Sequence, residues 1–66
     1  MVYERIADYL TDKGIKQAFL SRETGLSANA VSQILKGERK ITIEEYISIC
    51  AALGVELSYF AHGNVD

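Results

Sequence analysis

Apolar residues recur along this chain three or four positions apart, with polar residues between them, which is the spacing of amphipathic helices. Glycine follows four of these stretches, at Gly14, Gly25, Gly37 and Gly54. A left-handed glycine commonly ends a helix, so these breaks predict five helices, near residues 3–13, 16–24, 27–36, 43–53 and 57–61. We therefore expect an all-α fold, a compact bundle of five short helices, in a single domain that spans residues 1–66.

The apolar positions of these helices are expected to line one interior. They are Ile6, Tyr9, Leu10, Ile15, Leu20, Leu26, Val31, Ile34, Leu35, Ile43, Ile47, Cys50, Leu53, Val55, Leu57 and Phe60. Ser27 can cap the helix that follows it, and Thr42 with Glu45 fits a capping box. Lys16 and Glu56 offer no such cap, so the helices at 16–24 and 57–61 are expected to start less securely.

Composition narrows the classes of protein that this chain can belong to. With 66 residues, 48% of them apolar and 24% charged, it is one small globular domain without a bilayer-spanning segment. The amphipathic start, MVYERIADYL, has no export signal, and the lone Cys50 in an apolar stretch predicts a buried, unreactive thiol. We expect a cytoplasmic protein without a cofactor. His62 has no partner ligand, so no metal site is expected.

Residues 17–36, QAFLSRETGLSANAVSQILK, pair two short helical patterns across a turn that contains Gly25. Leu20, Leu26, Val31 and Ile34 fall on the inward side of this unit. The second helix keeps small and polar side chains together on its outward side, namely Ala28, Asn29, Ser32 and Gln33. Two helices joined in this way form a helix-turn-helix, the layout with which many proteins read DNA.

These residues resemble the helix-turn-helix of the Xre family, the Cro and repressor type, and the resemblance extends from about Arg5 to Phe60. Gln17 opens the first motif helix, Leu20 and Ser21 stand at the leucine and small-residue positions, and Gly25 occupies the turn. Val31 and Ile34 match the inward pair, and Gly37 and AALGVELSYF match the closing segment. The resemblance implies a DNA-binding transcriptional regulator, most often a repressor, and gives Gln17 the role of anchoring to a backbone phosphate.

Leu10 and Leu35 depart from the family, which frequently has an arginine and a glutamate there, joined as a partly buried ion pair. A hydrophobic pair can replace a buried ion pair, whereas changing one end alone would leave a buried charge unpaired. The double change therefore predicts that Leu10 touches Leu35.

The net charge of −2 argues against nucleic acid only if it is taken as a whole. Residues 13–40 hold six basic and two acidic residues, whereas the rest of the chain holds one basic and seven acidic ones. The positive charge therefore coincides with the helix-turn-helix, and it would orient the domain toward phosphates.

If the helix at 27–36 enters the major groove, its outward side chains reach base edges. Asn29 and Gln33 suit a bidentate contact with adenine, Ser32 suits several bases, and Ala28 offers only a methyl group. The expected phosphate contacts are Lys16, Gln17, Ser27, Lys36, Arg39 and Lys40. Each of these could instead be a solvated surface residue.

A single small module reads one half-site, so the expected partner is a two-fold DNA operator bound by a homodimer. The tentative dimer interface is Val55, Leu57, Tyr59 and Phe60. The alternative is a helix-turn-helix module for protein contacts, such as an antitoxin or a partner-sequestering regulator. Phe19, at a position that is often polar, could pack on a neighbouring helix or belong to a partner surface. No residue pattern suggests catalysis, so an enzyme is not expected.

Overall fold

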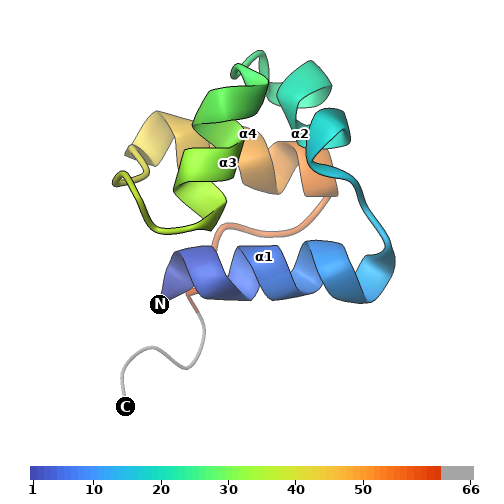
Figure 1. Cartoon of the computed structure of the whole chain (residues 1–66). Helices are drawn as coiled ribbons and strands as arrows, with labels where there is room; N and C mark the ends of the chain where they lie inside the picture. The colour runs from blue at the N-terminus through green and yellow to red at the C-terminus, as the bar shows by residue number, and fades with distance from the viewer. Residues whose placement is uncertain (62–66) are drawn as a thin grey trace.

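The structure is a computed structural model that describes residues 1–61, and within them it contains four α-helices and no strand. They are α1 (Val2–Lys13), α2 (Gln17–Thr24), α3 (Ala28–Leu35) and α4 (Ile43–Leu53). In Figure 1, α1 runs along the bottom, α2 and α3 lie above it, and α4 lies behind α3. The predicted all-α class is therefore confirmed, with four helices in place of five.

The caps anticipated from the sequence explain where two of these helices begin. The Oγ of Ser27 accepts the backbone N–H of Ala30 at 3.0 Å and starts α3. At the start of α4, the Oγ1 of Thr42 accepts the N–H of Glu45 at 3.1 Å, and a Glu45 carboxylate oxygen accepts the N–H of Thr42 at 3.0 Å. By contrast, the Lys16 side chain makes no cap bond at the start of α2, as expected.

One core holds the helices together. Its buried members are Ile6, Leu10, Leu20, Val31, Ile34, Leu35, Ile49, Cys50 and Phe60. α2 packs against both α3 and α4, and α1 packs against α3. Leu10 and Leu35 lie in this core, as predicted; their direct contact stays a prediction. Burial also raises the pKa of the Cys50 thiol, which makes the reactive thiolate scarcer.

The prediction for α4 was wrong at two positions. Ile43 and Ile47 were expected in the core, yet they are 68% and 45% exposed. The interior side of α4 is formed by Tyr46, Ile49, Cys50 and Leu53. Positions 46, 49, 50 and 53 also follow helical spacing, so the apolar residues of α4 form two neighbouring stripes and the rest of the molecule covers only one.

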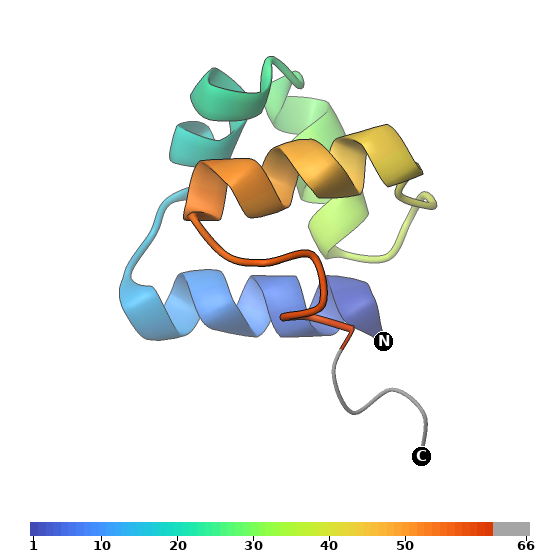
Figure 2. The same ribbon diagram turned by 180° about the vertical axis from the view of Figure 1, so that it is seen from behind.

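The predicted fifth helix was also wrong, because residues 57–61 form turns. This segment follows Gly54 and crosses the back of the molecule between α4 and α1 (Figure 2). The Tyr46 hydroxyl donates a hydrogen bond to the Leu57 carbonyl, and Arg5 donates from Nη1 to the Phe60 carbonyl at 3.2 Å. Side chains from α1 and α4 therefore hold the backbone of this segment without a helix.

Aromatic rings complete the attachment of this segment. The ring centroids of Tyr9, Tyr59 and Phe60 lie 5.1 to 5.6 Å apart in edge-to-face pairs, and Phe60 is buried in the core. Leu57, however, was expected in the core and is 50% exposed.

Within residues 1–61, no helix is both long enough and apolar enough to cross a bilayer.

Candidate nucleic-acid interface

A short turn joins α2 to α3, and hydroxyl side chains brace it. Gly25 has a φ of 81°, a left-handed conformation that L side chains rarely adopt. The Oγ of Ser21 donates a hydrogen bond to the Leu26 carbonyl at 2.6 Å. The Oγ1 of Thr24 accepts the N–H of Leu26 at 3.2 Å and donates to the Leu20 carbonyl at 2.6 Å. These bonds set how α3 leaves α2.

This role of Ser21 and Thr24 was not anticipated. The sequence contains a possible signal for these bonds, since Ser21 lies four positions before Gly25 and Thr24 lies directly before it. Ser and Thr side chains often bond to the backbone near turns, but their partner cannot be assigned until the path of the chain is known.

The inward side of the motif is buried deeply enough to give α3 a fixed orientation. Leu20, Val31 and Ile34 are each no more than 1% exposed. Because these residues face the core, the opposite side of α3 faces the surface. In Figure 1, α3 lies at the front of the molecule, beside α2. The helical spacing that predicted this side of α3 is confirmed.

We call Ala28, Asn29, Ser32 and Gln33 the reading face. Ala28 and Asn29 are exposed, and Ser32 and Gln33 are partly exposed. Within residues 1–61, the amide groups of Asn29 and Gln33 make no hydrogen bond to the protein. Both amides can therefore offer a donor and an acceptor to a ligand without first breaking an internal bond.

Most of the residues predicted to contact phosphates lie at the surface. Lys16, Gln17, Ser27, Lys36 and Lys40 are exposed. No side chain caps α2, and the N–H of Phe19 already bonds to the Lys16 carbonyl at 3.0 Å, so the backbone N–H groups of Gln17 and Ala18 are the ones that remain available to an anion.

Arg39 is the member of the predicted phosphate set that already has a partner. Its guanidinium donates from Nη1 and Nη2 to the two carboxylate oxygens of Glu45, at 3.3 and 2.7 Å, and from Nη1 to the Lys40 carbonyl at 3.2 Å. Hydrogen bonding from Arg39 to the Glu45 carboxylate, together with the bond from the Thr42 backbone, lowers the pKa of the Glu45 carboxyl. Arg39 thus ties the loop after α3 to the start of α4, and its remaining N–H groups could still reach a phosphate.

The part of the chain that the structure describes contains no group of side chains suited to bind a metal ion. Among residues 1–61, no three His, Cys, Asp or Glu side chains are grouped so as to hold a metal ion. His62 lies outside the described residues.

A braced turn, a buried inner side and two amide side chains without internal hydrogen bonds on the outward side of the second helix define a helix-turn-helix domain. The sequence model of the helix-turn-helix family matches residues 6–60, which is most of the chain. The chain therefore belongs to the Xre type of this family, a family of DNA-binding regulators that are generally not enzymes. Comparisons with curated proteins and with solved structures gave no match.

Proposed function

We propose that this protein is a sequence-specific transcriptional repressor that binds double-stranded DNA with α3 in the major groove. The observation that carries the proposal is the pair of exposed Asn29 and partly exposed Gln33. Neither amide has an internal partner, and the other side of α3 is buried in the core. Amide side chains at this place can pair with the N6 and N7 atoms of adenine. Ser32 and Ala28 would contact neighbouring bases.

The proposed phosphate contacts would set the position of the reading face on the duplex. We propose phosphate contacts from Lys16, Gln17, Ser27, Lys36 and Lys40, which are exposed, and from the unpaired part of the Arg39 guanidinium. Such contacts fix register and orientation, and they carry no sequence information directly.

We also propose that the protein binds a two-fold operator as a homodimer. Of the residues expected at the interface, Leu57 and Tyr59 are 50% and 52% exposed, whereas Phe60 is 2% exposed and serves the core of its own protomer. The unexpected exposure of Ile43 and Ile47 on α4 adds apolar surface. Ile43 and Tyr46 of α4 line one groove together with Ala61, so the start of α4 lies next to the C-terminal segment. A contact across Ile43, Ile47, Leu57 and Tyr59 would bury these side chains.

Selection from random duplexes at a fixed salt concentration tests the proposal. We expect enrichment of a short two-fold sequence, and we expect Asn29→Ala and Gln33→Ala each to weaken its binding by about 1–3 kcal/mol and to broaden the base preference. Circular dichroism would show that both variants keep their helices, since neither side chain has an internal hydrogen bond. Enrichment of no duplex over competitor DNA would overturn the proposal.

A further inference from the structure

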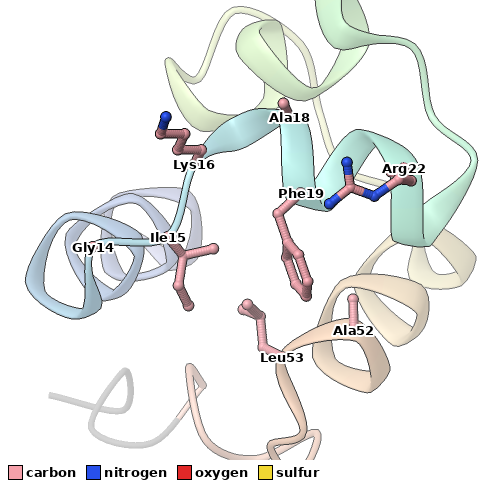
Figure 3. Close-up of a pocket in the computed structure, with 8 residues that line it drawn as sticks. All are labelled: Gly14, Ile15, Lys16, Ala18, Phe19, Arg22, Ala52 and Leu53. Carbon is pink, nitrogen blue, oxygen red and sulfur yellow. The ribbon is translucent and has the colours of Figure 1, made fainter.

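An apolar groove lies between α2 and the end of α4, and it has no place in the DNA contact proposed above. Its volume is about 540 Å³, and it is open to solvent. Its floor is formed by Ile15, Phe19, Ala52 and Leu53, all partly exposed. In Figure 3 the Phe19 ring hangs from α2 toward α4, close to Ala52 and Leu53, with Ile15 on its other side. We call this site the Phe19 groove.

Two cations stand at the edges of the Phe19 groove. Lys16 and Arg22 are exposed and lie on either side of the apolar floor (Figure 3). No carboxylate lines the described groove, and neither cation forms an ion pair within residues 1–61. The groove thus combines an aromatic and aliphatic floor with two cations that form no ion pair within residues 1–61.

This combination restricts the occupant. DNA phosphates could pair with the two cations, but they would leave the apolar floor uncovered. A two-fold contact between copies places the same patch of each copy against the other. Lys16 and Arg22 would then face the same cations of the second copy, and their repulsion would destabilise the contact. A segment that carries apolar side chains on one side and carboxylates beside them satisfies both the floor and the edges.

We propose that the Phe19 groove binds an acidic amphipathic segment of a partner protein. Its apolar side chains would cover Phe19 and Leu53, and its carboxylates would pair with Lys16 and Arg22. Because Lys16 is also a proposed phosphate contact, an occupied groove would draw this cation away from DNA and weaken operator binding. That consequence rests on the proposed function, whereas binding in the groove does not.

A library of random 16-residue peptides, displayed on phage and selected against the full chain without DNA, tests the groove directly. We expect the enriched peptides to combine Asp and Glu with aromatic or aliphatic residues at helical spacing. For a synthetic enriched peptide, Arg22→Glu should weaken binding roughly tenfold, because it replaces attraction by repulsion at a charged edge. Lys40→Glu makes the same change of net charge away from the groove, and it should leave the affinity within about twofold.

A second pair of variants avoids the core. Ala18 is exposed at the groove edge, so Ala18→Glu should weaken the same peptide while Ala18→Lys keeps or improves its binding. Enriched peptides without an acidic excess, no enrichment at all, or equal effects of Arg22→Glu and Lys40→Glu would overturn the proposal.

Adding operator DNA separates the two proposals. If the protein binds the peptide and the peptide also competes with DNA, both proposals stand. If it binds the peptide and no duplex is selected, only the repressor proposal fails. If it binds DNA and the peptide results fail as described, only the groove proposal fails.

Discussion

At the scale of the residue, the reading face depends on side chains that have no internal hydrogen-bond partner. Asn29 and Gln33 make no hydrogen bond within residues 1–61, so the proposed base contacts would displace water from their amides without breaking an internal bond. Their exposure could be predicted from the sequence, because Val31 and Ile34 leave α3 with a single apolar side. The hydroxyl bonds of Ser21 and Thr24 could not be, since each depends on where the turn carries the backbone.

Gly37 follows Lys36, the residue that caps the end of α3, and its replacement by a residue one methyl larger should be costly. Its φ is 74°, and the N–H of Glu38 donates to the Gln33 carbonyl at 2.9 Å across this turn. A Cβ at position 37 would lie 2.5 Å from Cζ of Tyr3. We expect Gly37→Ala to lower the free energy of unfolding by about 1–2 kcal/mol from the backbone alone, and by more because the Tyr3 ring has to move. Urea unfolding measures the loss.

Gly54→Ala is the matched control for this prediction. Gly54 has a φ of 71°, and a Cβ there would meet nothing within 4 Å. The difference between the two losses therefore reports the contact with Tyr3, and it should disappear when both changes are repeated in a Tyr3→Ala background. Equal losses of unfolding free energy in the original background would show that the Tyr3 ring moves aside without destabilising the fold.

Among the helices, α4 shows which features helical spacing predicts and which it does not. The pattern predicted that residues 43–53 form a helix and that Thr42 and Glu45 start it, and both predictions are confirmed. The pattern could not tell which apolar stripe faces inward, because Ile43 and Ile47 lie on one and Tyr46 and Ile49 on the other. Only the packing of α4 on α2 and the shared core decides between them.

The missing fifth helix has a related explanation. Its predicted start lacked a capping side chain, and a helix of one turn gains little from its own hydrogen bonds. The observed segment is held instead by Tyr46 and Arg5, which lie 11 and 55 residues away in the sequence. Such long-range partners cannot be identified from local pattern.

The start of α4 should respond to acid. The Arg39 hydrogen bond lowers the pKa of Glu45 below its ordinary value of 4.5. A carboxyl whose pKa is lower in the folded state stabilises the fold above its unfolded pKa, and this contribution is lost as the pH falls through the folded pKa. We expect Glu45→Gln to cost no more than about 1 kcal/mol at neutral pH, because the ion pair is partly exposed, and to cost progressively less below pH 4.5.

Urea unfolding at neutral and acid pH measures this difference. Glu44→Gln is the control, since Glu44 is an exposed carboxylate in the same helical turn and has no ion pair within residues 1–61. Its effect on stability should be smaller at neutral pH. A loss from Glu45→Gln that stays constant from neutral to acid pH would contradict a role for the carboxylate charge.

At the scale of the whole molecule, the separation of charge should appear in the salt dependence of DNA binding. Six of the seven basic residues lie between positions 13 and 40, which include α2 and α3. Each phosphate contact releases counterions, so the slope of log K against log salt counts the contacts. We expect Lys36→Ala to lower affinity evenly across sequences and to reduce the slope by about 1.

Lys13→Ala is the comparison for this measurement. Lys13 ends α1 with its Nζ 5.8 Å from the centroid of the Tyr9 ring, and it is not among the proposed contacts. Titrations of the selected duplex at several salt concentrations should give this variant nearly the original slope. If both variants change the slope alike, the effect comes from net charge and Lys36 makes no direct contact.

The proposed homodimer can be tested at Leu57. Tyr46 and Arg5 hold the backbone around Leu57 in place, so its exposed side chain is presented in a fixed position and loses little freedom when it is covered. We therefore expect Leu57→Glu to raise the dimer dissociation constant at least tenfold, because a two-fold contact buries two new carboxylates in apolar surroundings. Sedimentation equilibrium measures this change. Ser58→Glu adds the same charge at the next exposed position and should have a much smaller effect; similar effects of the two variants would place the interface elsewhere.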